Sequence, residues 1–396
     1  MNILSLAIQA KDASLKLQSL SEEMRLTALD AISKALLSHE DEILRENKKD
    51  LEDARTNNLS SAMLDRLTLT QKSIFALSVM CTEIANQKQV VGMIVESHTR
   101  NDGLLIQKQR IPLGVIGMIF ESRPNVVVDG AALAIKSGNA IILKGGKEAQ
   151  HSNRKLFEII HQATASVLPK GAISLIETRE DVAEVLKLDK YIDLMVPRGG
   201  SALINYVKAN AMMPVVAHDK GLCHLYVHED CDIDATAVVI NAKVQRPSAC
   251  NALETLILHE DYPNNDEIIQ ALKANGVTVK HPATDEDYQT EWLEKKISIK
   301  IVQNHHEAIN HIKKYSSHHT EAILAKDERV IEDFLNLLDA SCIAINASTR
   351  FNDGGELGLG AELGISTSKL HAYGPMGASE MTTTRFIVTG NGHVRK

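Results

Sequence analysis

Cys250 is the side chain whose type and setting best suit it to chemistry. It stands in the stretch QRPSACNALET (residues 245–255), among small and polar neighbours and close to Arg246. A cysteine reacts as its thiolate, which nearby positive charge and a helix N-terminus both stabilise, and the residues after the proline are compatible with the start of a helix. The pattern admits two interpretations, a catalytic nucleophile or a small apolar side chain buried in a core.

The other cysteines fit the second interpretation. They are scattered, form no CxxC pair and are expected to be reduced thiols of a cytoplasmic protein: Cys81, Cys223, Cys231 and Cys342. The sequence contains no zinc-ligand spacing, so we expect no metal site. The pairs His305/His306 and His318/His319 lie in a polar stretch and are interpreted as solvated histidines.

Two glycine turns offer backbone N–H groups to an anion. Lys144-Gly145-Gly146 and Arg198-Gly199-Gly200-Ser201 each follow an apolar run, and a helical pattern (SALINYVKANA) follows the second turn. Free N–H groups at a helix N-terminus bind phosphate well. Simple turn chemistry is the alternative, because the GxGxxG and Walker patterns are both absent.

A glycine-rich segment, RFNDGGELGLGAELGISTSKLHAYGPMG, begins at Arg350 and also carries Glu356, Glu362, Lys369 and His371. Glycine allows backbone to approach a ligand closely. The segment predicts a loop wrapped around a ligand, with a flexible connection as the alternative.

Composition points to a small soluble substrate. The chain has 396 residues with a net charge of -8 and 44% hydrophobic residues, which argues against a nucleic-acid or anionic-membrane surface. The N-terminus reads as an amphipathic helix instead of a signal peptide, and no apolar window is long enough to span a bilayer.

The periodicity places these residues on an α/β scaffold. Residues 1 to 90 repeat apolar positions at helical spacing and predict a helical layer. Asn101-Asp102-Gly103 then indicates a β-hairpin. Short apolar runs at 114–120, 140–146, 172–177 and 192–200 alternate with helical stretches, which is typical of a doubly wound parallel sheet with ligands at the carboxyl ends of its strands.

A second α/β unit is expected after residue 220. It contains a helix from Asp232 to Val244, a turn at Cys250, a strand in TLILHE and further elements as far as residues 341–349. The tail MTTTRFIVTGNGHVRK has strand-forming residues, which predict pairing with the early hairpin or with a neighbouring subunit.

Several long motifs make a family resemblance clear. GVIGMIFESRPNVVVDGAALAIKSGNAIILKGGKEA, VPRGGSALI, RPSACNALETLILH, HTEAIL and INASTRFNDGGELGLGAELGISTSKLHAYGPMG occur in order along nearly the whole chain. The sequence resembles the γ-glutamyl phosphate reductases of the aldehyde dehydrogenase superfamily. The resemblance implies a cytoplasmic enzyme that uses NADPH to reduce L-glutamate 5-phosphate to L-glutamate 5-semialdehyde with release of phosphate, in proline biosynthesis from glutamate.

The resemblance also implies three parts. Residues 1–97 and 111–222 would form a Rossmann-like cofactor domain, residues 223–360 an α/β catalytic domain, and residues 98–110 and 378–396 a small β oligomerisation flap. Such a flap implies a homo-oligomer, a dimer or a tetramer. A transient contact with glutamate 5-kinase would protect an acyl phosphate that cyclises readily.

The family motifs imply roles for individual residues. Cys250 matches the nucleophile, and Asn125 or Arg123 would complete the oxyanion hole. The residues that match cofactor-binding positions are Lys144, Gly145, Gly199, Gly200, Ser201 and Glu291. Arg123, Arg350 and Lys369 are the cations expected to hold the substrate.

Two departures from related sequences bear on the reaction. Hydrolytic aldehyde dehydrogenases carry a glutamate in an ELGG motif ahead of the cysteine, and the corresponding stretch here is VVAHDKGLCH. A thioester that must wait for hydride is protected when that base is missing, although His218 and Asp219 offer alternative acid–base groups. Tyr373 replaces the arginine of HARGPMG found in many relatives, so other cations must hold the substrate.

Two rival functions remain at this stage. An acylating aldehyde dehydrogenase that uses a CoA thioester has the same fold and would show competition by CoA. An inactive scaffold that binds glutamate kinase is the second rival, and the joint presence of Cys250, Lys144 and the Gly199-Gly200-Ser201 turn argues against it.

Overall fold

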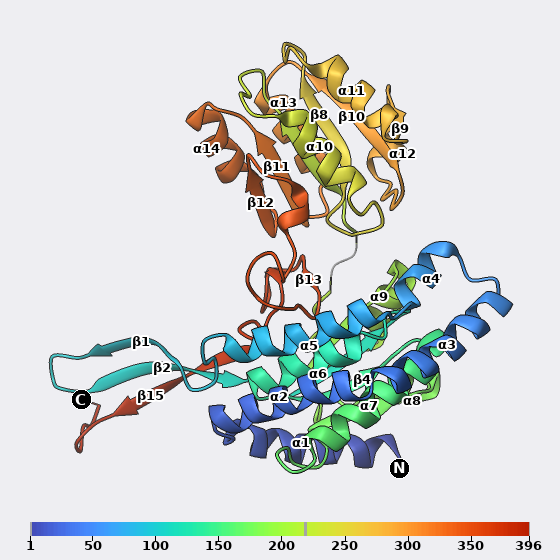
Figure 1. The fold of residues 1–396 in the computed structure, drawn as a ribbon. Helices are drawn as coiled ribbons and strands as arrows, with labels where there is room; N and C mark the ends of the chain where they lie inside the picture. The colour runs from blue at the N-terminus through green and yellow to red at the C-terminus, as the bar shows by residue number, and fades with distance from the viewer. Residues whose placement is uncertain (1, 218–219, 396) are drawn as a thin grey trace. The chain divides into compact units, whose positions relative to one another are not determined.

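The computed structural model of the chain describes residues 2–217 and 220–395 and contains two compact units (Figure 1). The first unit comprises Met1–Val216, Gly358–Gly364 and Met376–Lys396. The second unit comprises Ala217–Leu357 and Ile365–Pro375. No helix among the described residues combines the length and the apolar character needed to cross a membrane.

The N-terminal part of the first unit is the predicted helical layer. Asn2 caps the first helix by accepting the N–H of Ser5 at 2.8 Å, and Thr70 and Ser73 form a capping box at the fifth. The helices bury alanine and leucine faces, as their periodicity predicts. They are α1 (Ile3–Gln18), α2 (Glu22–Ser38), α3 (Glu40–Thr56), α4 (Ser61–Leu67) and α5 (Gln71–Asn86).

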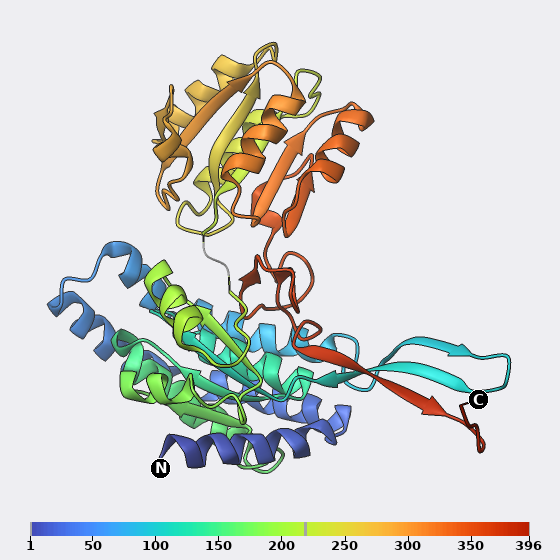
Figure 2. The same cartoon turned by 180° about the vertical axis from the view of Figure 1, so that it is seen from behind.

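A four-stranded parallel sheet lies at the centre of the first unit, in the order β5-β4-β3-β6. Helices α6 and α7 cover one face, with α2 packed over both, while α1 contacts the other face (Figures 1 and 2). The prediction of a doubly wound parallel sheet is confirmed. The strands are β3 (Val115–Phe120), β4 (Ala140–Lys144), β5 (Ile173–Ile176) and β6 (Leu194–Arg198), and the helices are α6 (Val126–Ser137), α7 (Gln150–Thr164), α8 (Arg179–Val185) and α9 (Ser201–Asn210), with a 3-10 turn at Lys147–Ala149.

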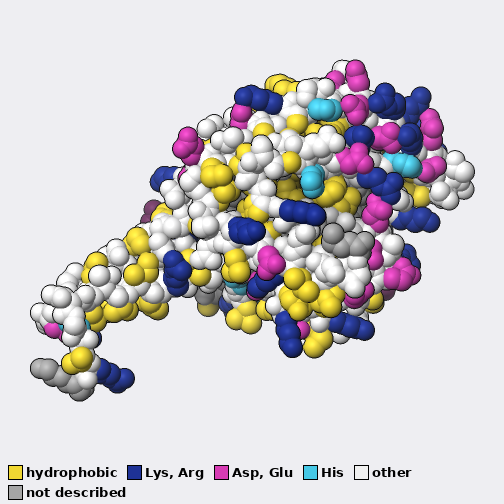
Figure 3. Space-filling model, turned by 90° about the horizontal axis from the view of Figure 1, so that it is seen from below, with side chains coloured by type: hydrophobic (Ala, Val, Ile, Leu, Met, Phe, Trp, Pro, Cys, Tyr) yellow, Lys and Arg dark blue, Asp and Glu magenta, His cyan; other side chains and the backbone are white. Residues whose placement is uncertain are grey.

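A three-stranded antiparallel flap extends from the first unit (Figure 1). The predicted hairpin consists of β1 (Ile94–Thr99) and β2 (Leu105–Pro112), and β15 (Thr382–Thr389) pairs with β2 along its whole length. The tail therefore pairs with the hairpin of its own chain. Apolar side chains remain exposed on this flap, including Phe386 and Val388 (Figure 3).

The second unit is built on a six-stranded parallel sheet in the order β12-β11-β7-β8-β10-β9. Residues of α10 and α11 pack in one core cluster, and residues of α13 and α14 in another. The strands are β7 (Cys223–Val227), β8 (Leu253–His259), β9 (Thr278–Lys280), β10 (Lys296–Val302), β11 (Thr320–Leu324) and β12 (Cys342–Ile345). The helices are α10 (Ala235–Val244), α11 (Asn265–Ala274), α12 (Asp285–Tyr288), α13 (His305–Tyr315) and α14 (Glu328–Leu337).

The glycine-rich segment is mostly irregular. It contains a 3-10 turn at Thr349–Phe351 and a two-stranded antiparallel sheet of β13 (Ile365–Ser366) and β14 (Gly374–Pro375). The chain passes from the second unit to the first and back within this segment, at residues 358–364. The compact units thus change at Val216 and near Leu357, whereas the boundaries expected from the sequence were residues 222 and 360.

One local expectation is confirmed and another is wrong. Cys250 stands in the expected turn, which leads directly into strand β8, so the helix start that its neighbours would also allow does not form. His319 is not solvated: it is fully buried, and its Nδ1 lies 2.7 Å from the Thr320 hydroxyl.

Candidate active site

Cys250 lies in a tight turn that enters β8. The N–H of Ala249 bonds to the carbonyl of Arg246 at 3.1 Å, and the N–H of Ala252 bonds to the carbonyl of Ala249 at 3.0 Å. The Cys250 side chain is neither buried nor fully exposed. Because Cys250 precedes β8, it belongs to the amino edge of its parallel sheet.

Asn251 ties this turn to the start of the glycine-rich segment. Its side-chain amide donates to the carbonyl of Asn352 at 2.9 Å, and its own carbonyl accepts from the Thr349 hydroxyl at 2.7 Å. Asn251 is 3% exposed. A buried amide with several partners holds a turn in one conformation, so the Asn251 that follows the cysteine serves to fix it.

Arg350 lies next to the cysteine turn. Its carbonyl accepts from the Asn251 side-chain amide at 3.3 Å, and its Nε donates to the side chain of Gln245 at 3.0 Å. Burial lowers the pKa of Arg350, and the charge of Arg246 adds to this effect, whereas the charge of Asp353 acts in the opposite direction.

Gly221 and Cys223 both lie against the carbonyl group of Cys250. A Cβ built on Gly221 would lie 1.9 Å from the carbonyl oxygen of Cys250, so this position has no room for a side chain. The thiol of Cys223 donates to the same carbonyl oxygen at 3.2 Å. Cys223 is buried as expected, but it also contacts the nucleophile's backbone.

Gly221→Ala should therefore impair activity more than stability. Overpacking costs about 1–3 kcal/mol, and displacing a reacting group by about 1 Å can lower kcat about 100-fold. We expect such a loss in steady-state assays. Gly276→Ala is the matched control, because its Cβ would meet nothing within 4 Å although φ is +77°. Normal kcat in Gly221→Ala would show that the packing against Cys250 has no catalytic consequence.

Glu291 contacts Gly221, the glycine that packs on Cys250. Its Oε1 accepts the N–H of Gly221 at 2.9 Å. The second unit thus brings Cys250, Arg350 and Glu291 into one neighbourhood, although 41 positions of sequence separate Cys250 from Glu291. His218 and Asp219, the alternative acid–base groups, lie outside the described residues.

In the first unit, the residues expected to bind the cofactor lie at the carboxyl edge of the sheet. Lys144 is the last residue of β4 and is half-buried; burial lowers its pKa, while Glu148 and Glu121 oppose that shift. Gly145 has no room for a Cβ, which would lie 2.0 Å from the Asn153 amide. A shallow hollow opens at this point, lined among others by Gly145, Gly146, Asn153 and Glu177.

The second glycine turn follows β6. Gly200 is the N-cap of α9, and Ser201 is the first residue of that helix. The N–H of Gly200 donates to Glu121 Oε2 at 2.8 Å, so a carboxylate holds the place predicted for an anion. A Cβ on Gly199 would lie 2.4 Å from the same carboxylate. The role of this turn in binding a cofactor stays a prediction.

Asn125 and Arg123 precede α6. The Asn125 amide donates to Asp129 Oδ2 at 2.9 Å. Burial raises the pKa of Asp129 to about 6, against the opposing effects of Arg198, of the Asn125 hydrogen bond and of Arg123. Ser122 has a φ of 42°, in the left-handed region, and its N–H donates to Glu148 at 2.7 Å. The backbone just after β3 is therefore held in one strained conformation, and such strain is common at functional sites.

Lys369 forms an ion pair with Asp339. Its Nζ is 2.8 Å from Asp339 Oδ2, and the side chain is 67% exposed. Tyr373 donates its hydroxyl to the same carboxylate at 3.0 Å, and burial together with Asp339 raises the pKa of Tyr373. The residue that replaces the family arginine therefore pairs with Asp339.

Sequence reasoning missed two charged residues behind the turn. Lys243 on α10 and Glu254 on β8 form a fully buried ion pair of 3.0 Å. The signal was available, because each charged residue stands among mostly apolar residues in its element. Periodicity alone did not show that they meet.

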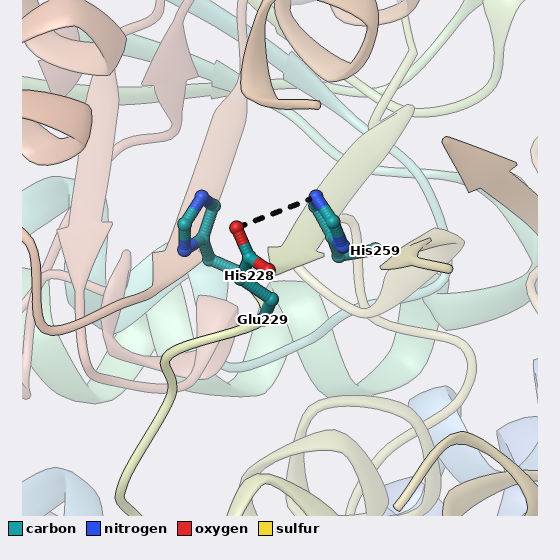
Figure 4. A group of neighbouring side chains, drawn as sticks. All are labelled: His228, Glu229 and His259. Atoms are coloured by element: carbon teal, nitrogen blue, oxygen red, sulfur yellow. Dashed lines mark ion pairs between the residues drawn. The ribbon is translucent and has the colours of Figure 1, made fainter. Parts of the chain in front are cut away.

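Among the described residues, His228, Glu229 and His259 form a group at the carboxyl ends of β7 and β8, whereas Cys250 lies at the amino end of β8 (Figure 4). His259 Nδ1 accepts the N–H of Asp261 at 3.1 Å, so in the neutral ring Nε2 carries the proton and faces Glu229 at 3.9 Å. A protonated nitrogen is no metal ligand. The geometry therefore gives no support for a cation here, and the expectation of no metal site stays a prediction.

Comparison with known proteins agrees with the fold. The model of the aldehyde dehydrogenase family matches residues 7–292. A gamma-glutamyl phosphate reductase of Nautilia profundicola is 46% identical, with 98% of each chain covered, and that of Carboxydothermus hydrogenoformans is 44% identical, with 99% of each covered. The crystal structure of the Thermotoga maritima gamma-glutamyl phosphate reductase has a TM-score of 0.95 at 40% identity, with both chains fully covered.

A more distant structure, an acetylating aldehyde dehydrogenase from Geobacillus thermoglucosidasius, shares the fold with a TM-score of 0.77 at 18% identity, covering 100% of this chain and 97% of the other. The fold class and the oxidoreductase class expected from the sequence are confirmed. The chain belongs to the aldehyde dehydrogenase family and, within it, to the gamma-glutamyl phosphate reductases.

Proposed function

We propose that this protein reduces L-glutamate 5-phosphate to L-glutamate 5-semialdehyde with NADPH and releases phosphate. One observation carries the proposal: the chain matches gamma-glutamyl phosphate reductases over its whole length, with Cys250 held in a fixed turn beside Arg350. The product would serve proline biosynthesis from glutamate in the cytoplasm.

Cys250 is the nucleophile in this proposal. Its thiolate attacks the acyl carbon, a C–S bond forms, and the bond to the phosphate oxygen breaks as phosphate leaves with the electron pair. Hydride addition to the thioester gives an oxyanion, which the Cys250 N–H and the Asn125 or Arg123 side chain would stabilise. The oxyanion then re-forms a carbonyl and expels the thiolate, which restores Cys250.

NADPH would supply the hydride. The residues present fit this cofactor, because glycines follow the carboxyl ends of both β4 and β6, where backbone can approach a ligand closely, and Lys144 ends β4 directly before Gly145. Lys144 would hold the adenosine ribose, and Gly145, Gly199, Gly200 and Ser201 would lie against the cofactor. Glu291 would hold the nicotinamide ribose.

Arg350 is the cation best placed to hold the substrate. Its Nη1 is buried and has no hydrogen-bond partner among the described residues, which suits an incoming phosphate or carboxylate. Lys369 already pairs with Asp339, so its role would require that ion pair to open. Arg123 would serve from the first unit.

The missing hydrolytic base supports a reductase. The stretch VVAHDKGLCH has no glutamate, so the glutamate that activates water against the thioester in hydrolytic aldehyde dehydrogenases has no counterpart in it. An enzyme without this base keeps the thioester for hydride.

The flap would mediate homo-oligomer formation as a dimer or tetramer. All residues of β1 are exposed, β1 is an edge strand, and Phe386 is 68% exposed. Such an edge is a template for pairing with a second copy. Phe386→Asp is expected to shift sedimentation towards smaller species; unchanged sedimentation would exclude the flap as the contact. Co-sedimentation with glutamate 5-kinase tests the proposed transient contact.

The function is tested in the reverse direction. Glutamate 5-semialdehyde, NADP and inorganic phosphate are incubated with the protein, and reduced nicotinamide is followed by absorbance. Phosphate-dependent formation of NADPH is the expected result. Formation without phosphate would indicate a hydrolytic dehydrogenase, and a requirement for CoA would indicate an acylating dehydrogenase.

Lys144→Ala tests the cofactor assignment. Loss of a hydrogen bond from a charged group is worth about 1.5–3 kcal/mol, so KM for NADP should rise about tenfold to a hundredfold at constant kcat. Lys170→Ala, which removes an exposed lysine of the same unit, is the control. An unchanged KM in Lys144→Ala would refute the assignment.

A further inference from the structure

The buried ion pair behind the cysteine turn has no part in the chemistry described so far. Lys243 Nζ lies 3.0 Å from Glu254 Oε2, and the two side chains are 0% and 2% exposed. Burial raises the pKa of Glu254 to about 7 and lowers the pKa of Lys243, while each charge favours the other. Burying an ion pair gives little net stability, so the pair calls for a role beyond stability.

Glu254 also holds a backbone segment. Its Oε2 accepts the N–H of Trp292 at 3.2 Å, and its Oε1 accepts the N–H of Leu293 at 3.3 Å. With the lysine, the carboxylate therefore accepts three donors, as expected of the ionised form. Leu293 has a φ of 52°, in the left-handed region that a leucine rarely adopts. The carboxylate thus stabilises a strained conformation.

The segment held in this way carries Glu291. The Glu291 carboxylate accepts the N–H of Gly221, and Gly221 packs directly on the backbone of Cys250. Glu254 itself stands four residues after Cys250, at the start of β8. A continuous set of contacts within the second unit therefore runs from Glu254 through Glu291 and Gly221 to Cys250.

We propose that Glu254, held by Lys243, is a positioning residue that fixes Glu291 relative to Cys250. This inference rests on the proposed function, in which Glu291 holds the nicotinamide ribose and Cys250 carries the acyl group. Under that function, Glu254 sets the distance across which hydride reaches the thioester. Glu254 itself touches neither substrate nor cofactor.

Glu254→Gln is the first test. Glutamine keeps the size of the side chain but replaces one acceptor oxygen with an NH₂ donor. At the Oε2 position this donor opposes Lys243 and the N–H of Trp292, and at the Oε1 position it opposes the N–H of Leu293. A misplacement of about 1 Å lowers rates about 100-fold, so kcat should fall to that extent and KM for NADP should rise. Alkylation of Cys250 by iodoacetamide should keep its wild-type rate, because the thiol and Arg350 are unchanged.

Tryptophan fluorescence gives a direct readout of the segment. Trp292 is the only tryptophan in the sequence, and its indole N–H donates to the Ser298 hydroxyl at 3.3 Å. Glu254→Gln should shift the Trp292 emission and increase its quenching by acrylamide. A residue that contributes only stability would leave the emission of the folded protein unchanged.

Two further variants separate positioning from stability. Glu22→Gln removes the partner of Lys136, another fully buried lysine, in the first unit; it should lower Tm and leave kcat and the Trp292 emission unchanged. Lys243→Met with Glu254→Met removes both charges and every acceptor for the two N–H groups. This double variant should recover Tm relative to Glu254→Gln and keep the low kcat.

The outcomes are distinct. Recovery of kcat in the double variant, or normal kcat and emission in Glu254→Gln, would overturn the proposal. A wild-type protein without phosphate-dependent turnover would overturn the proposed function, and the role in hydride transfer with it. Normal wild-type turnover with an unaffected Glu254→Gln would overturn the positioning role alone.

Discussion

Cys250→Ala is expected to abolish phosphate-dependent formation of NADPH from glutamate 5-semialdehyde. Removing the nucleophile of a covalent mechanism typically costs at least about 10⁴-fold in kcat. Alanine has no thiolate, so neither the hemithioacetal nor the thioester forms. The measurement is the rate of absorbance change at the reduced-nicotinamide band, at saturating phosphate and NADP.

Cys342→Ala is the matched control for this experiment. Cys342 is a half-buried thiol in β12 of the same unit, and burial raises the pKa of Cys342. Its loss should leave kcat near the wild-type value. Substantial turnover by folded Cys250→Ala would mean that hydride transfer proceeds without a thioester at this residue.

Asn125→Ala should produce the next largest loss. A single oxyanion-hole donor contributes about 10²–10³-fold to kcat. In the structure, the Asn125 amide donates to buried Asp129, which fixes the side chain before any substrate binds. We expect kcat to fall to this extent while KM for NADP stays constant, because only the transition state loses a contact.

Arg123→Ala decides between the two candidate donors. If Asn125 supplies the oxyanion contact, Arg123→Ala should raise KM for the phosphate-bearing substrate and change kcat little. The reverse pattern, a large kcat loss in Arg123→Ala and a small one in Asn125→Ala, would assign the oxyanion contact to Arg123. Both variants need a thermal melt, since both residues help to stabilise the Asp129 carboxylate.

The elements of this protein could be predicted from local sequence because their signals are local. The apolar runs at β3 and β4 are buried along nearly their whole length, as expected of central parallel strands. The hairpin followed from Asn101-Asp102-Gly103, whereas the strand-forming tail predicted a strand but not whether it pairs with this hairpin or with a neighbouring subunit. The motifs around Cys250 and Lys144 were also contiguous, which is why a family could be identified without a structure.

The setting of Cys250 shows where local signals leave two outcomes open. Small and polar residues after a proline are compatible with a helix start and also with a turn into a strand. Pairing of β8 with β7 and β10 decided the outcome, because it incorporates Leu253 and the following residues into a sheet. The cysteine therefore lies at the amino edge of its sheet.

By itself, the sequence determined the element types and the family, and it singled out Cys250 as the candidate nucleophile. Only the tertiary structure decided that Gly221 packs on Cys250, that Glu291 bonds to Gly221, and that Lys243 meets Glu254. The physical reason is that periodicity reports which face of an element is buried, whereas pairing of two buried groups depends on strand order and register. Those are set by contacts between residues far apart in the chain.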